Sequence, residues 1–147
     1  MNHKSKEENQ FNEFYVVSQY QSQGIKIPSD KRNNISGSYE LKCADDVVFK
    51  PFGQEPVLIH TGLKASMPES NVLMVYDHHL NAIDHHIMMM PAILTFNNEY
   101  FENGGEICAY FQNYANYPVT LHKGDKIMEA VFVKTFDTNS RDVWREF

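Results

Sequence analysis

Four histidines stand in two pairs, His78-His79 and His85-His86, and each pair follows an aspartate. Imidazole nitrogens bind metal ions or donate to phosphate oxygens, and histidine titrates near neutral pH. On a helix, residues seven apart share a face but lie about 10 Å apart along the axis. That separation is too large for one ion with ligand bonds of about 2 Å, and no pair has the i, i+4 spacing of helical zinc ligands. The spacing argues against one metal site shared by the four histidines, and donation to phosphate by His78 and His79 stays open. A metal site across an oligomer axis and a solvated polar helix remain alternatives.

A second group of residues that could take part in a reaction is the run Phe96-Asn97-Asn98-Glu99-Tyr100. The Asn97 amide can hydrogen-bond a water molecule but cannot take its proton at neutral pH. Glu99 can supply a carboxylate to accept that proton if the local turn brings it close to the same water. Two consecutive asparagines also suit an ordinary turn, and Tyr100 also suits simple packing. A role in binding water and a purely structural role both fit these residues.

The elements that must position these residues read as strands. Short apolar runs rich in β-branched and aromatic residues alternate with turn residues. This pattern is typical of an all-β sandwich or barrel. We predict strands over Phe14–Ser18, Val47–Phe49, Val57–His60, Val72–Tyr76, Ile107–Phe111 and Met128–Phe136, with a further short strand between Pro118 and the Lys-Gly-Asp-Lys turn.

Helix is expected at one place only, from Leu80 to about His86. The following run, Ile87 to Met90, precedes Pro91, which favours an edge strand or a bend over a central strand. The strand pattern spans residues 13–136, so we predict one β domain there, with a polar N-terminal tail over 1–12 and a C-terminal tail over 137–147.

Composition narrows the class of protein. A chain of 147 residues is long enough to bury one sizeable core. The formal net charge of −6 argues against a nucleic acid polymer as partner but permits a nucleotide, which needs few local donors. Two cysteines make no disulfide framework, and the N-terminus is not a secretory signal. No apolar run is long enough to span a membrane. A cytoplasmic location, of a host or infected cell, is expected.

Four segments together carry a resemblance to the trimeric dUTPase family. Each matches a family motif, and the four occur in the family's order. They are Gly37-Ser38-Tyr39-Glu40-Leu41, Ile59-His60-Thr61-Gly62-Leu63-Lys64-Ala65-Ser66-Met67-Pro68, Gly105-Glu106-Ile107, and Lys123-Gly124-Asp125-Lys126-Ile127-Met128-Glu129-Ala130-Val131-Phe132. The resemblance runs from about residue 14 to 136. It implies a distorted jelly-roll-like barrel, a homotrimer, and Mg²⁺-dependent hydrolysis of a deoxynucleoside triphosphate, dUTP favoured, to the monophosphate and pyrophosphate.

The resemblance also implies roles for individual residues. Glu40 takes the place of an aspartate that helps to hold the hydrated metal, although a solvent-facing strand residue is equally in keeping with its position. Asn97 stands where the family has the aspartate that orients the attacking water. Tyr100 matches the tyrosine that packs under the deoxyribose. Glu129 replaces a glutamine that contacts phosphate, and Lys126 replaces an arginine, for which an ion pair or a surface role is expected.

The departures from the family pattern are concentrated at the phosphates. His78 and His79 stand in place of the arginine and serine of a Pro-Arg-Ser-Ser motif. The family's Gly-rich C-terminal motif is not recognisable, and the chain ends in Val143-Trp144-Arg145-Glu146-Phe147. Arg145 and Phe147 could close over the nucleotide, or these terminal aromatic residues could anchor the tail on a neighbouring subunit. The alternative function is therefore a catalytically lapsed member of the fold that binds a nucleotide or a protein partner. The divergence favours a phage or viral source.

Overall fold

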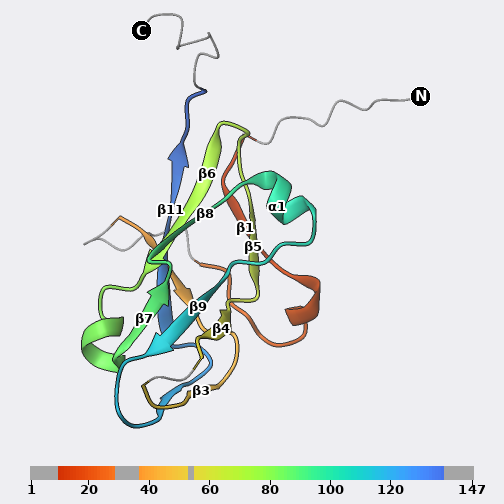
Figure 1. The fold of residues 1–147 in the computed structure, drawn as a ribbon. Coiled ribbons are helices and arrows are strands. Elements are labelled where there is room, and N and C mark those ends of the chain that lie inside the picture. Colours follow the sequence, from red (N-terminus) through yellow and green to blue (C-terminus); the bar gives the residue numbers. More distant parts are fainter. Residues whose placement is uncertain (1–9, 29–36, 53–54, 138–147) are drawn as a thin grey trace, which may run out of the picture.

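The computed structural model describes residues 10–28, 37–52 and 55–137. Within these ranges the chain is mostly strand (Figure 1). The strands are β1 (Glu13–Val16), β2 (Tyr39–Lys42), β3 (Val47–Phe49), β4 (Val57–His60), β5 (Leu63–Ser66), β6 (Asn71–Asp77), β7 (Ile87–Met90), β8 (Ile93–Phe96), β9 (Cys108–Asn113), β10 (Val119–Leu121) and β11 (Lys126–Lys134). The helical elements are a 3₁₀ turn, η1 (Ser18–Tyr20), a π-helical turn, η2 (Asn81–His85), and a short α-helix, α1 (Asn98–Glu102).

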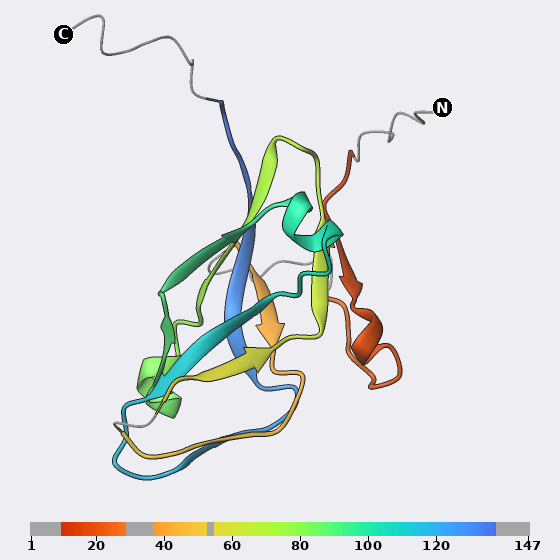
Figure 2. The same ribbon diagram turned by 45° about the vertical axis from the view of Figure 1, so that its right-hand side comes forward.

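The described strands form four antiparallel sheets. The largest has the order β2-β11-β6-β8, and a three-stranded sheet has the order β4-β9-β7. Two pairs, β1-β5 and β3-β10, complete the set. Figure 2 shows the three-stranded sheet crossing the four-stranded sheet. The all-β, jelly-roll-like class is thus confirmed, but these sheets stay separate and do not close into a barrel.

The core lies between the sheets, and several strands bury alternate residues in it. Along β9 the buried positions include Ala109 and Phe111, with Tyr110 exposed between them, and β7 buries Ile87 and Met89 in the same way. This period of two is the signature of a strand with one face in the core. The same core receives Leu73 and Val75 from β6, Ile59 from β4 and Ala130 from β11.

Most of the predicted elements are confirmed. β3 and β4 have the predicted bounds, β1, β6, β9, β10 and β11 agree within a few residues, and β7 is an edge strand, as Pro91 indicated. The expected helix is present as the π-helical turn η2. The sequence did not indicate α1, η1, β2, β5 or β8. The predicted tails fall largely outside the described residues, and none of the helices in the described ranges is long and apolar enough to cross a membrane.

A buried asparagine holds the turn between β9 and β10. The Asn113 side-chain nitrogen donates to the backbone oxygens of Lys50 at 2.9 Å and of Tyr117 at 2.8 Å. Its oxygen accepts from the Ala115 amide at 2.8 Å. One side chain therefore satisfies three backbone groups and joins this turn to the segment after β3.

Replacing this asparagine should destabilise the protein strongly. Asn113→Ala leaves the backbone groups without their partners, and each buried unsatisfied group costs about 1–3 kcal/mol. We expect the free energy of unfolding in urea to fall by about 2–4 kcal/mol. Asn116→Ala, at an exposed position of the same turn, is the control and should change stability by no more than about 0.5 kcal/mol. Equal losses from the two variants would show that the side chain of Asn113 does not hold the turn.

Candidate active site

Two glutamates meet across neighbouring strands. β2 and β11 are antiparallel, and Glu40 lies directly opposite Glu129. Side chains of directly opposed residues leave the sheet on the same face. Glu129 is only 2% exposed, and its carboxylate accepts a hydrogen bond from the Ser38 hydroxyl at 3.0 Å. A buried carboxylate beside a second carboxylate requires cationic or hydrogen-bonding neighbours.

The turn that follows β6 supplies those neighbours, and its shape depends on Asn81. This buried side chain donates to the Asp77 carboxylate and to the Ile127 backbone oxygen, both at 2.7 Å. Asp77 in turn accepts from the Met89 amide at 3.0 Å. The β11–β2 register shifts between Lys126 and Met128, as it does at a β-bulge, and Ile127 is the residue within that shift. The bulge and the asparagine together fix the turn against β11.

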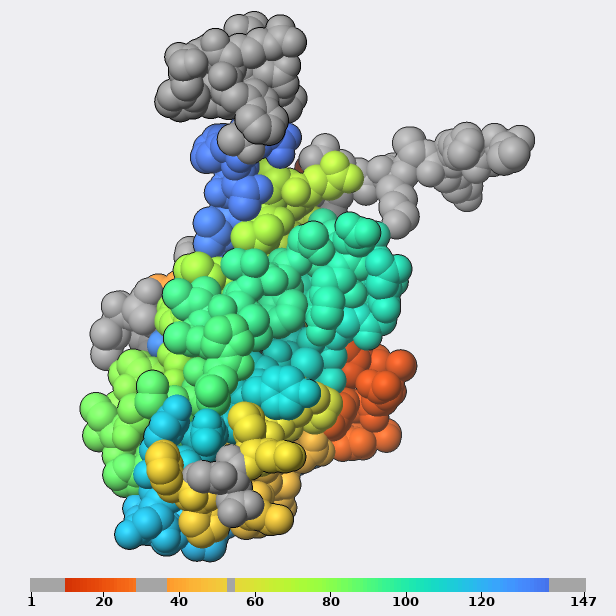
Figure 3. Space-filling view, in the orientation of Figure 1, coloured from red at the N-terminus to blue at the C-terminus, as the bar shows by residue number. Residues whose placement is uncertain are grey.

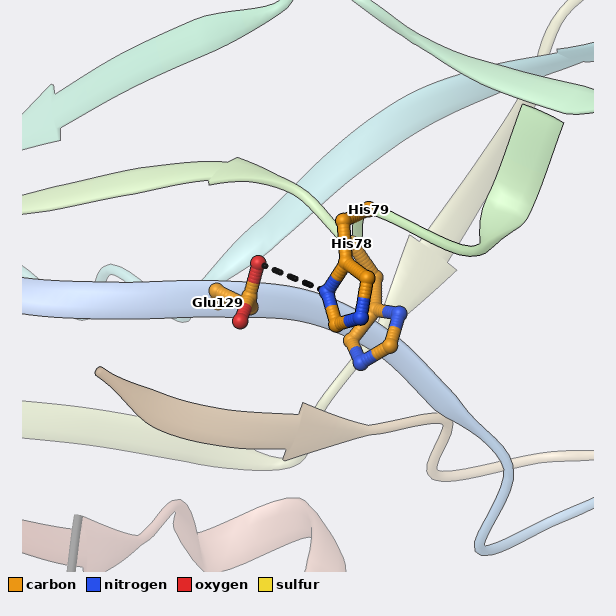
Figure 4. Close-up of side chains that lie close together, drawn as sticks. All are labelled: His78, His79 and Glu129. Atoms are coloured by element: carbon orange, nitrogen blue, oxygen red, sulfur yellow. Dashed lines mark ion pairs between the residues drawn. The ribbon is translucent and has the colours of Figure 1, made fainter. Parts of the chain in front are cut away.

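His78 and His79 lie at this turn with their rings stacked, the centroids 4.5 Å apart. His78 is 4% exposed, and its Nε2 lies 3.6 Å from a Glu40 oxygen. The Nδ1 of His79, which is 53% exposed, lies 3.5 Å from a Glu129 oxygen. Figure 4 shows His79 pointing toward Glu129 from the turn. Each imidazole therefore faces one of the two glutamates.

Lys126, the first residue of β11, completes the group. Its Nζ donates to the second oxygen of Glu40 at 2.8 Å. This hydrogen bond lowers the pKa of the Glu40 carboxyl, with a smaller contribution in the same direction from His78, and partial burial opposes both. The ion pair confirms the role expected for Lys126.

Glu40 also lines a cavity of about 860 Å³ beside β2. Among the described residues around it, the cationic ones are Lys26, Lys42, Lys123 and Lys126, and Glu40 is the only acidic one. This cavity is thus electropositive in a chain that is negative as a whole. Such a local excess of positive charge suits an anionic ligand.

A second hollow, of about 580 Å³, lies at the other predicted group. Asn97, Glu99 and Tyr100 line it together with the loop from Asn103 to Glu106. The Asn97 oxygen accepts from the Tyr100 amide at 3.0 Å and caps α1. Asn97 therefore caps a helix where the sequence indicated an ordinary turn, and a water-binding role would have to coexist with this cap. Glu99 is exposed in the first turn of α1.

Tyr100 lies against the backbone of the loop after α1. Its hydroxyl donates to the Glu106 carbonyl oxygen at 2.6 Å and accepts from the Glu106 amide at 3.2 Å. A Cβ on Gly105 would come within 2.4 Å of the tyrosine ring, so this position requires glycine. Glu106 is held in turn by His60 at 2.8 Å and by the Gly62 amide at 2.8 Å. The loop that forms the hollow is rigidly tied to β4 and β5.

The predicted site residues thus fall into two groups within one chain. Glu40, His78, His79 and Glu129 come together, and Asn97, Glu99 and Tyr100 come together around α1. The turn η2 and the helix α1 lie on opposite sides of the molecule in both ribbon views (Figures 1 and 2). Arg145 and Phe147 lie outside the described residues. Sequence reasoning missed Ser38 as the partner of Glu129, although Ser38 lies in the first motif.

The chain was compared with known proteins. It is 30% identical, over 123 residues, to the deoxyuridine 5′-triphosphate nucleotidohydrolase of Lactococcus lactis subsp. lactis, a match that spans 82% of this chain and 80% of that relative. No protein-family model matches the sequence.

Solved structures with the same fold are dUTPases at lower identity. The dUTPase of Streptococcus mutans superposes with a TM-score of 0.76 at 22% identity, covering 87% of this chain and 99% of that one. A mutant dUTPase of the Staphylococcus aureus phage phi11, studied for its coordination of a structural Mg(II) ion, gives a TM-score of 0.72 at 16% identity, covering 90% and 95%. These two likenesses establish the fold.

The ion pair of Lys126 gives a prediction with a defined pH dependence. Because the folded pKa of Glu40 is below its ordinary value of 4.5, the pair stabilises the fold above that pH. The contribution is lost as the pH falls through the folded pKa. Lys126→Ala should therefore lower the free energy of unfolding by up to about 1 kcal/mol near neutral pH, and the difference from wild type should shrink in acid.

The measurement is urea unfolding at a series of pH values. Lys134→Ala, at the exposed end of the same strand, is the control and should show no such pH trend. A Lys126→Ala deficit that is equal at acidic and neutral pH would contradict the assignment of this pair.

Proposed function

Because this chain belongs to the dUTPase family, we propose that it hydrolyses dUTP to the monophosphate and pyrophosphate with Mg²⁺ as cofactor. The observation that carries the proposal is the 30% identity to a deoxyuridine 5′-triphosphate nucleotidohydrolase over 82% of this chain. The fold agrees with it across nine tenths of the chain. The remaining question is how the altered motif residues serve this reaction.

The phosphate chain is assigned to the face that bears Glu40, Glu129 and the histidine pair. His79 is the most exposed member of that group, so it is the donor to phosphate in place of the family's arginine and serine. Glu129 by itself would repel a phosphate, but it is buried and is held by Ser38 and His79. Lys126 adds a positive charge on the same side. These groups would offset the charge of the phosphate oxygens.

Glu40 fits the role of a magnesium ligand. Mg²⁺ prefers oxygen ligands and is usually held by one or two carboxylates together with substrate phosphates and water. Glu40 offers such a carboxylate at the edge of the electropositive cavity. When bound, the ion would offset the negative charge on the phosphates during phosphoryl transfer.

The nucleoside is assigned to the hollow beside α1. The ring of Tyr100 is fixed by its hydrogen bonds to Glu106 and lies over Gly105, so it offers a rigid surface to the deoxyribose. Two carboxylates line this hollow. Glu106 is held by His60 and by the Gly62 amide, so Glu99 is the one that can accept a proton from the attacking water. Asn97 can hold that water through the hydrogen-bonding capacity left over from its cap.

We propose a homotrimer because one chain does not bring its two groups together. In an assembly, the α1 end of one copy would meet the phosphate face of another. An apolar strip on the outer face of β7 and β9 supports such an association: Met88, Met90 and Tyr110 are all exposed there, and Met90 pairs directly with Tyr110. The surface over these strands faces the reader in Figure 3. Exposed apolar surface of this kind is typical of an interface.

The proposed location is the cytoplasm, where nucleotide pools lie.

Pyrophosphate release tests the proposed activity. Purified protein is incubated with Mg²⁺ and each deoxynucleoside triphosphate, and dUTP should be cleaved preferentially. Glu40→Ala and Glu99→Gln should each lower kcat/KM by about 10²-fold or more, since each removes a proposed charged participant. Glu102→Gln, a second exposed glutamate of α1, is the matched control and should leave the rate unchanged. The absence of pyrophosphate from every substrate would overturn the proposal.

One observation favours the second candidate, a member that binds without turnover. Asn97 is an amide, and its oxygen is used to cap α1. Asn97→Asp tests this point, because aspartate caps a helix as well as asparagine does and adds the missing carboxylate. If the wild-type protein turns over, the variant should raise kcat. If wild-type protein releases no pyrophosphate while dUTP raises its melting temperature, the binding function is the correct one.

A further inference from the structure

The cluster at the end of β6 contains an imidazole nitrogen without a hydrogen-bond partner. The Nε2 of His78 is fully buried and has no partner within hydrogen-bond distance. Among the residues that the structure describes, the Glu40 carboxylate lies 3.6 Å from it. The other ring nitrogen accepts from the Leu80 amide at 3.2 Å. A buried polar atom in this state is costly unless something binds it.

His78 also belongs to a cluster of metal-binding side chains. One ligand atom each from His78, His79 and Glu129 lies within 4.8 Å of the others. Figure 4 shows the two stacked rings at the turn and the Glu129 side chain beside them on β11. Two of them, His78 and Glu129, come from rigid, buried positions. The third, His79, opens the cluster to solvent, which provides a path for an ion.

The distances between nitrogen and oxygen indicate what kind of ligand fits. His79 lies 3.5 Å from Glu129, and this separation is long for a charge-assisted hydrogen bond. Two ligands bound to one tetrahedral ion at about 2.1 Å lie about 3.4 Å apart. The spacing of this pair is therefore that of two groups bridged by an ion.

The chemistry of the donors selects the class of ion. Two imidazole nitrogens and one carboxylate suit zinc and its neighbours among the divalent transition metals. Magnesium prefers a shell of oxygens only. From these observations we propose that His78, His79 and Glu129 form a binding site for one divalent transition-metal ion of the zinc class, distinct from the magnesium that accompanies the nucleotide.

The surroundings provide the supporting shell that such a site needs. Ser38 donates to one oxygen of Glu129, and His79 lies 3.5 Å from the other. Hydrogen bonds of this kind orient metal ligands. Two changes accompany binding. His79 turns out of the ring stack, since a metal lies in the plane of an imidazole, and its exposure leaves room for that. The His78 ring proton moves to Nδ1, so the Leu80 amide gives up its 3.2 Å contact with that nitrogen.

The test is isothermal titration calorimetry, in which Zn²⁺ is added to the untagged, full-length protein in the absence of nucleotide. We expect saturation at one ion per chain. His79→Gln and Glu129→Gln should each weaken binding by more than about tenfold. Glutamine at 129 keeps an acceptor for Ser38, and position 79 is exposed, so both variants should fold. Circular dichroism checks this.

His85→Gln is the matched control, because His85 belongs to the same turn but not to the cluster. It should leave the affinity unchanged. Crystals grown with zinc should show an anomalous peak among the three side chains. No saturable zinc binding, binding that survives His79→Gln and Glu129→Gln, or an anomalous peak elsewhere would each overturn the proposal. Since no nucleotide is present, this result is independent of whether dUTP is hydrolysed.

Discussion

The arrangement of this molecule depends on one unfavourable contact that the sheet enforces. Antiparallel pairing of β2 with β11 sets Glu40 directly opposite Glu129, and like charges in that position destabilise a sheet. Everything that gathers around them reduces this repulsion. Lys126 binds one carboxylate, Ser38 binds the other, and the stacked histidines face both. The polar cluster is a consequence of strand register.

That register is itself fixed from both sides of β11. The strand pairs with β2 on one edge and with β6 on the other, and in the second pairing Glu129 lies opposite Tyr76. The shift around Ile127 turns its carbonyl oxygen to the turn after β6, where it accepts from the His78 amide and from Asn81. The two histidines are therefore positioned by backbone and amide contacts that do not depend on their own charge. A site positioned in this way can change its polar residues while the fold persists.

The sequence predicted the frame of this site better than its contacts. Apolar runs bounded by turn residues located β4, β6 and β11, because β-branched and aromatic residues favour strands. The same reasoning examined His78 only against His85 and His86, its neighbours in the chain. Its real neighbours, Glu40 and Glu129, are distant in sequence, and they meet it through a register that a one-residue slip would reverse. The helix α1 was missed because Asn97 and Asn98 suit a turn as well as a cap. The sequence could not show which residues far apart in the chain make contact. An ion pair or a surface role was nevertheless expected for Lys126 from its motif.

The central claim is that the glutamate and histidine face of one copy receives the phosphates of a nucleotide whose sugar rests on Tyr100 of another copy. A crystal structure with Mg²⁺ and a non-hydrolysable dUTP analogue tests this most directly. The account predicts phosphate oxygens within hydrogen-bond distance of His79, with the deoxyribose on the Tyr100 ring of a neighbouring copy. Phosphates bound on any other face of the chain, or a nucleotide held wholly within one copy, would contradict it.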